Sequence, residues 1–190
     1  MKLLLASKSP RRRELIASLG LEVEYVAIHV DEHLDVLVPA SEMALHIARK
    51  KANSYPIQSL PSDTILVTAD TTVVLGNDVL GKPATRAEAV GMLHRLSGKR
   101  HTVFTGVCLR SSSAEDSFSE STGVYFRDLT DKEIEYYVDT YHPYDKAGAY
   151  GIQEWIGMVG IERIEGCYYN VMGLPVARLY DRLTKKFLSR

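Results

Sequence analysis

Residues 64–70 read TILVTAD, and this stretch indicates the fold. The run from Ile65 to Ala69 is apolar or β-branched throughout, which is typical of a strand in the centre of a sheet. Asp70 follows directly, and a carboxylate is expensive to leave unused at the end of a central strand. Ligands in open α/β sheets collect beyond the carboxyl ends of strands. Asp70 is therefore a candidate catalytic or metal-binding residue, with an aspartate that only starts a turn as the alternative.

Strand-like runs and helix-like stretches alternate on both sides of this segment. Strands are predicted at 2–6, 22–28, 64–69, 101–109 and 122–126, with a hairpin at 73–80. The polar segment 111–121 is expected to be an exposed connection. Together these runs predict an α/β fold in which helices flank a mixed central sheet.

Helix starts carry clear capping signals. Ser9 and Pro10 are predicted to open the first helix, and residues 41–54 form the second. Thr85 and Thr130 each precede a glutamate by three residues, the spacing of a capping box. A last helix is expected to begin near Pro175 and to end in a basic tail.

Length and composition restrict the function. The 190 residues, 45% of them apolar, predict a single domain over residues 1–190. A net charge of -1 disfavours nucleic acid as a partner, since no basic excess exists to neutralise its phosphates. No run approaches the roughly 18 apolar residues that span a bilayer, so no membrane partner is expected. The lone cysteines Cys108 and Cys167 favour reduced thiols and a cytoplasmic location.

Several cations and carboxylates have local positions that favour function. Arg11, Arg12 and Arg13 occupy the first turn of a helix, where free amides already make the surroundings positive. With Ser7 and Ser9 they form either a phosphate cradle or a solvated basic turn.

Lys51 lies at the edge of an apolar helix face, where it either snorkels to solvent or reaches into a cleft to hold phosphate or a carboxylate. Asp31 and Glu32 follow an apolar strand and supply either further carboxylates or a solvated loop. Lys82 stands in a stiff turn between Gly81 and Pro83. His101 is a candidate base, although a structural histidine at a strand start is favoured.

In order and spacing, these positions resemble the Maf family of nucleotide pyrophosphatases over nearly the whole chain. The matching stretches are SKSPRR (7–12), VDE (30–32), ARKKA (48–52), TADT (68–71), GKP (81–83), LSG (96–98), TG (105–106), KAGAYGIQ (146–153) and YNVMGLP (169–175). The segment 146–153 is similar to the branch of the family that acts on dTTP and UTP, rather than the branch that acts on methylated GTP. One departure is visible, because Glu154 and Trp155 stand where the family pattern continues with glycine.

The resemblance implies a role for each matching position. Asp70 corresponds to the catalytic acidic residue, and Arg12, Thr71 and Gln153 to residues that govern substrate choice. The family's other cleft positions fall on Ser9, Arg13, Glu32, Lys51 and Lys82. The implied fold has a deep central cleft, as in inosine triphosphatases, and is often a homodimer.

The implied reaction is hydrolysis of dTTP and UTP to the monophosphate and pyrophosphate, as housekeeping of the nucleotide pool. A free aspartate, with a pKa of about 3.9, is a poor base near neutrality, so a metal that acidifies the attacking water is favoured. Asp70 and Glu32 are hard oxygen ligands suited to Mg²⁺ or Mn²⁺. The alternative function is a nucleotide-binding regulator of cell division without turnover, and Asp70 beside the phosphate-binding set favours the enzyme.

Overall fold

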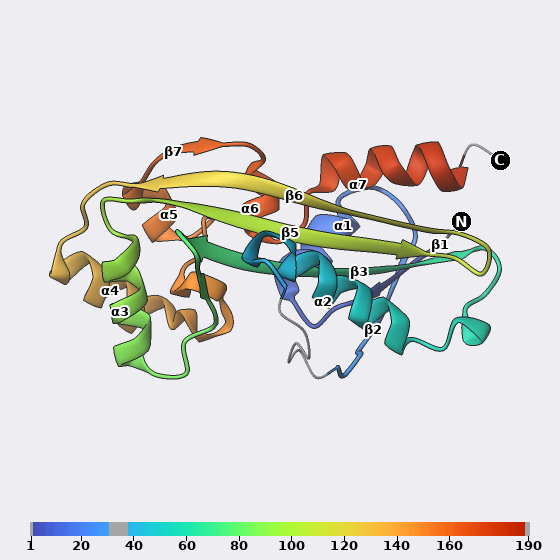
Figure 1. The fold of residues 1–190 in the computed structure, drawn as a ribbon, viewed down its shortest axis with the longest axis horizontal. Coiled ribbons are helices and arrows are strands. Elements are labelled where there is room, and N and C mark those ends of the chain that lie inside the picture. Colours follow the sequence, from blue (N-terminus) through green and yellow to red (C-terminus); the bar gives the residue numbers. More distant parts are fainter. Residues whose placement is uncertain (1, 31–37, 189–190) are drawn as a thin grey trace. The chain divides into compact units, whose positions relative to one another are not determined.

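A computed structural model describes residues 2–30 and 38–188 (Figure 1). The chain forms two compact units. Unit 1 comprises Met1–Asp70, Thr105–Glu120 and Gly173–Arg190, and unit 2 comprises Thr71–Phe104 and Ser121–Met172. The long strands β3 (Thr64–Leu75), β5 (Arg100–Arg110) and β6 (Glu115–Phe126) contribute residues to both units. The single domain expected from the length of the chain stays a prediction.

Among the described residues, seven strands form one sheet in the order β2-β1-β3-β5-β6-β7, with β4 paired to β3 outside this path. In unit 1, β1 (Lys2–Ala6) runs parallel to both β2 (Val23–Val26) and β3. In unit 2, β4 (Asp78–Leu80) is antiparallel to β3, and β7 (Ile161–Glu165) is antiparallel to β6. Parallel and antiparallel pairs therefore occur together, and the predicted mixed sheet is confirmed.

The helices of unit 1 are α1 (Pro10–Ala17), α2 (Ala40–Ser54), η1 (Ile57–Ser59), α7 (Val176–Leu183) and its continuation η4 (Thr184–Leu188). Helix α2 buries a face of small and apolar side chains: Ala44, Ile47, Ala48 and Ala52. Gly106 on β5 faces this helix, and a Cβ atom there would lie 2.3 Å from the Cα of Leu45. Only glycine lets the helix backbone approach the strand this closely.

The helices of unit 2 are α3 (Arg86–Leu96), α4 (Asp131–Tyr141), η2 (Pro143–Asp145), η3 (Ala147–Ala149), α5 (Trp155–Gly160) and α6 (Tyr168–Met172). Both predicted caps are present, because Thr85 and Thr130 accept hydrogen bonds from the backbone of Glu88 and Glu133. The box at Thr130 is complete, whereas the carboxylate of Glu88 binds the N–H of Ala84 instead. The capping pattern thus located both helix starts.

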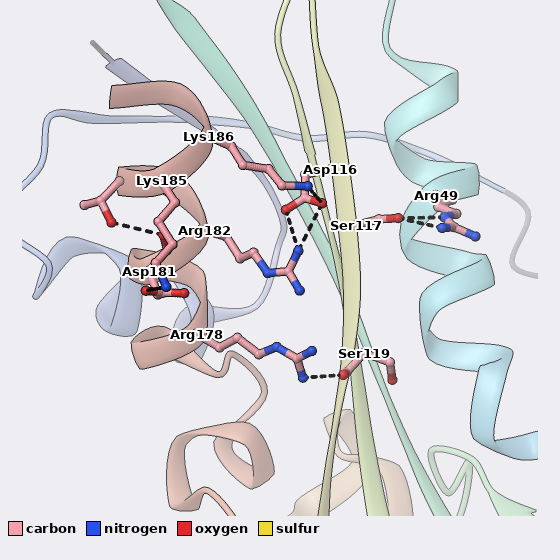
Figure 2. Close-up of polar contacts among 10 residues, drawn as sticks. Arg49, Asp116, Ser117, Ser119, Arg178, Asp181, Arg182, Lys185 and Lys186 are labelled. Atoms are coloured by element: carbon pink, nitrogen blue, oxygen red, sulfur yellow. Dashed lines mark hydrogen bonds and ion pairs between the residues drawn. The ribbon is translucent and has the colours of Figure 1, made fainter. Parts of the chain in front are cut away.

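The connection predicted at 111–121 is confirmed only for residues 111–114, and the rest of the prediction is wrong because β6 already begins at Glu115. Alternate residues of this polar strand are bound from opposite faces (Figure 2). Arg49 of α2 donates to Ser117 Oγ at 2.6 Å, while Arg182 and Lys186 of the C-terminal helix donate to the buried carboxylate of Asp116. Partners distant in sequence thus stabilise the first half of β6, which has little apolar character of its own.

Aromatic contacts reinforce this docking of the C-terminal helix within unit 1. Phe118 shares the face of Asp116, and the guanidinium groups of Arg178 and Arg182 lie 5.1 and 5.7 Å from its ring centroid. Arg178 also donates to the carboxylate of Glu120 at 2.6 Å. The basic tail expected from the sequence is therefore part of the packing of unit 1.

No helix among residues 2–30 and 38–188 has the length and apolar character needed to cross a membrane. Both cysteines are free thiols, and Cys108 is fully buried. Burial raises the pKa of the Cys108 thiol to about 12, so it remains protonated and unreactive near neutrality.

Replacing Asp116 tests the docking of the C-terminal helix. We expect Asp116→Asn to lower the free energy of unfolding by about 1–2 kcal/mol, because hydrogen bonds to charged groups are lost while Arg182 and Lys186 stay partly hydrated. Denaturant titration measures this change. Asp181→Asn, which removes an exposed pair with Lys185, is the control and should change it by only about 0.3 kcal/mol. Equal effects of the two variants would contradict the assignment.

Candidate active site

An ion pair between Lys51 and Asp70 is the centre of the candidate site in unit 1. Lys51 Nζ lies 2.8 Å from Asp70 Oδ1, and the two side chains are only 16% and 13% exposed. Lys51 is on the last turn of α2, and Asp70 follows the buried residues 64–69 of β3. The strand continues to Leu75, so the prediction that it ends before Asp70 is wrong. The alternative in which Lys51 holds a carboxylate is therefore the one observed, and its partner is the predicted catalytic residue.

The register of α2 on β3 determines this contact. The hydroxyl of Thr68 donates to the carbonyl of Ala48 at 2.7 Å, and both residues are fully buried. Lys51 lies three residues after Ala48 on the same helix face, and Asp70 lies two residues after Thr68 on the same face of the strand. The buried hydrogen bond between Thr68 and Ala48 thus fixes the register in which Lys51 of α2 faces Asp70 of β3.

Ser9 caps helix α1 as predicted. Its hydroxyl accepts from the backbone N–H of Arg12 at 3.4 Å, and its own N–H donates to the buried Ser7 hydroxyl at 3.1 Å. Backbone carbonyls bind the neighbouring guanidinium groups, Arg12 through Gly173 at 2.8 Å and Arg13 through Ser7 at 3.2 Å. The first turn therefore gathers cations whose positions are fixed by protein contacts, and the phosphate cradle stays a prediction.

The remaining substrate-binding candidates belong to unit 2. Thr71 is half-buried on β3, and Lys82 is exposed in the turn after β4. The N–H of Gly148 donates to the carbonyl of Gly81 at 3.0 Å, which joins this turn to the segment leading to Gln153. The Oε1 atom of Gln153 is buried, and no described residue donates a hydrogen bond to it.

Two residues beside Gln153 were not singled out from the sequence. Tyr137 and Lys146 are buried, and both bind the carboxylate of Glu154. A lysine directly before the small residues 147–149 was the available signal, because a buried lysine needs an anionic partner. The neighbouring Asp145 is one such partner, 2.7 Å from Lys146 Nζ, whereas Glu154 could not be identified as a partner from the sequence because the fold of the loop brings it there.

The predicted metal site rests on Asp70 alone among the described residues. Glu32, the second proposed ligand, lies outside the described residues, as does Asp31. Residues 2–30 and 38–188 contain no cluster of three or more histidine, cysteine or carboxylate side chains that could hold a metal ion. Mg²⁺ is commonly bound by one or two carboxylates together with substrate phosphates and water, so a single aspartate fits such an ion.

His101 has the surroundings of a structural histidine. It is 1% exposed, and its Nε2 lies 2.7 Å from the hydroxyl of Tyr150. Its Nδ1 is buried without a partner among the described residues, so a charged imidazolium would lack one hydrogen bond. Burial, with a smaller effect of Arg100, lowers the pKa of His101 to about 4. Such a group is a poor base near neutrality, which agrees with the favoured prediction of a structural histidine.

Comparison with known proteins covers nearly the whole chain. The family described as Maf-like protein matches residues 2–186. Two relatives named "dTTP/UTP pyrophosphatase" are each 49% identical to this chain, one from Parabacteroides distasonis (96% of this chain, 94% of the relative) and one from Bacteroides thetaiotaomicron (97% and 95%). A protein of the same name from Porphyromonas gingivalis is 47% identical over 96% of this chain and 92% of its own.

The buried neutral state of His101 predicts a pH dependence of stability. Below its unfolded pKa of about 6.5 the unfolded chain binds a proton that the folded protein does not bind until about pH 4. We therefore expect the free energy of unfolding to fall as the pH drops from 6.5 to 4, by up to about 3 kcal/mol from this group.

Denaturant titrations across this pH range check the prediction. In the His101→Gln variant, the free energy of unfolding should depend less steeply on pH, by the contribution of about one proton. Identical slopes for wild type and His101→Gln would contradict the burial argument.

Proposed function

The chain belongs to the Maf-like family, and on that premise we propose that it hydrolyses dTTP and UTP to the nucleoside monophosphate and pyrophosphate. The observation that carries the proposal is the Lys51–Asp70 pair, 2.8 Å apart, in which Asp70 occupies a half-buried position within the mostly buried strand β3. Relatives named for this activity are 47–49% identical over nearly the whole chain. The enzyme class is that of hydrolases acting on phosphorus-containing anhydrides.

Asp70 and Lys51 have complementary tasks in this reaction. Cleavage between the α and β phosphates needs a water in line with the α phosphorus and neutralisation of the negative triphosphate. The carboxylate of Asp70 can orient that water and accept its proton, while the ammonium group of Lys51 can bind a phosphate oxygen. An incoming triphosphate competes with Asp70 for Lys51, so substrate binding releases the carboxylate for its task.

A divalent cation is part of the proposal. Asp70 offers one hard carboxylate oxygen, and Glu32 is proposed as a second ligand on the basis of the family resemblance. Mg²⁺ or Mn²⁺, when bound, neutralises phosphate charge and lowers the pKa of a bound water. If a phosphate oxygen paired with the ammonium group of Lys51, the Asp70 oxygen that Lys51 now binds would be available to such an ion.

Gln153 is proposed to recognise the base. Uracil and thymine share an N3 donor and an O4 acceptor, which match the acceptor and the donor of one amide. The unpartnered, buried Oε1 of Gln153 supports this role, because a buried acceptor is costly to leave unsatisfied. Arg12 and Thr71 are proposed to assist substrate choice. A cytoplasmic location and a homodimeric state are further parts of the proposal.

A nucleotide panel tests the function directly. With Mg²⁺ or Mn²⁺ present, we expect pyrophosphate release from dTTP and UTP with kcat/KM roughly 10- to 100-fold above that for ATP and GTP, the range available to one polar contact and pocket size. EDTA should abolish release, and added metal should restore it. A preference for a purine triphosphate would overturn the substrate assignment, and undiminished turnover in EDTA would overturn the metal.

Asp70→Asn separates catalysis from binding. The amide keeps the shape of the side chain but cannot accept a proton or hold a cation well, so kcat should fall by about 10²- to 10⁴-fold. Nucleotide affinity measured by calorimetry should change by less than about 10-fold, since the phosphate-binding cations remain.

Asp78→Asn is the matched control, because this aspartate is exposed and pairs with Arg95 on the surface. It should turn over like the wild type. Activity of Asp70→Asn within about 10-fold of the wild type would exclude Asp70 as the catalytic residue.

A further inference from the structure

The turn formed by residues 151–154, which carries Gln153, is closed at both ends by one buried hydroxyl. Tyr137 Oη accepts from the N–H of Gly151 at 3.0 Å and donates to the carboxylate of Glu154. The backbone N–H of Glu154 donates to the carbonyl of Gly151 at 3.0 Å, which completes the turn. Gln153 is the third residue of this turn, so contacts made by its neighbours determine where it lies.

Lys146 compensates the charge of this carboxylate. Its Nζ lies 3.1 Å from Glu154 Oε1, and the two side chains are 9% and 19% exposed. Burial raises the pKa of Tyr137, and the hydrogen bond to Glu154 raises it further, so the hydroxyl keeps its proton and remains a donor. Glu154 is therefore bound by an ammonium group on one oxygen and a hydroxyl on the other.

The side chain of Glu154 does not cap the helix that it precedes. Glu154 is the N-cap residue of α5, yet its side chain makes no hydrogen bond to that helix. It folds back over Gly151 instead, where a Cβ atom would lie 2.9 Å from the Glu154 Cδ. The absence of a side chain at Gly151 makes room for the carboxylate.

We propose that Glu154 is a positioning residue for base recognition, which holds the turn so that the amide of Gln153 meets the pyrimidine. The inference rests on the proposed function and adds a residue that does not itself touch the substrate. A recognition group held by a supporting hydrogen-bond network loses little entropy on binding. A displacement of about 1 Å in such a group can lower the rate about 100-fold.

The test compares UTP with ribose 5-triphosphate, which has the same triphosphate but no base for Gln153 to recognise. Glu154→Gln keeps the shape of the side chain and removes one of the two carboxylate charges that pair with Lys146, while Asp145 retains the other. We expect kcat/KM for UTP to fall about 10- to 100-fold, while kcat/KM for ribose 5-triphosphate changes less than about threefold. Tyr137→Phe removes the shared hydroxyl and should give the same split. Glu162→Gln, an exposed change on β7, is the control and should alter neither.

Each outcome decides the matter. An equal loss with both substrates, or no loss with UTP, would overturn the positioning role while the pyrophosphatase activity stands. Failure of both Glu154→Gln and Tyr137→Phe to fold, judged by thermal unfolding, would assign the network to stability and overturn it too. Wild-type protein that cleaves neither substrate would overturn the proposed function and this inference with it.

Discussion

The ion pair between Lys51 and Asp70 depends on how closely α2 packs against the sheet in unit 1. Both side chains are more than four-fifths buried, so each charge needs the other. Removing the partner of a buried charge commonly destabilises a protein by about 3–5 kcal/mol. The small residues Ala48 and Gly106, and the hydrogen bond from Thr68, bring the helix to the required distance. The apolar packing of α2 is thus a condition for the proposed chemistry and not only for stability.

This dependence explains which parts of the candidate site could be predicted. Asp70 at the end of an apolar run and Lys51 at the edge of a helix face are local signals, and each can be recognised within about two helical turns of sequence. Their contact is not local, because it joins two elements through the register of α2 on β3. The sequence therefore identified both residues and left open whether Lys51 reached solvent, phosphate or a carboxylate.

Strand β6 shows the same limit for the fold. Pattern alone predicted most of the strands that carry apolar residues, and the helices that begin with a cap, but it did not predict β7. The polar half of β6 lacks both signals, since Asp116 and Ser117 acquire their partners from two helices far away in the chain (Figure 2). A charged residue inside a strand is unfavourable until Arg182 and Lys186 are in place. The polar residues of this segment locally favour a loop, and contacts with distant helices make it a strand instead.

The loop of Gln153 shows which residues can be inferred from resemblance to a family and which cannot. The residues that perform chemistry can be transferred by position, because each is required by the reaction itself. A positioning residue such as Glu154 is required only by the local packing, and it needs Tyr137, Lys146 and the bare Cα of Gly151 together. A glycine at position 154 would remove one of the two carboxylates that pair with the buried Lys146 and leave Asp145 as its partner. On this proposal, substrate preference depends on a set of buried contacts as well as on the residue proposed to recognise the base.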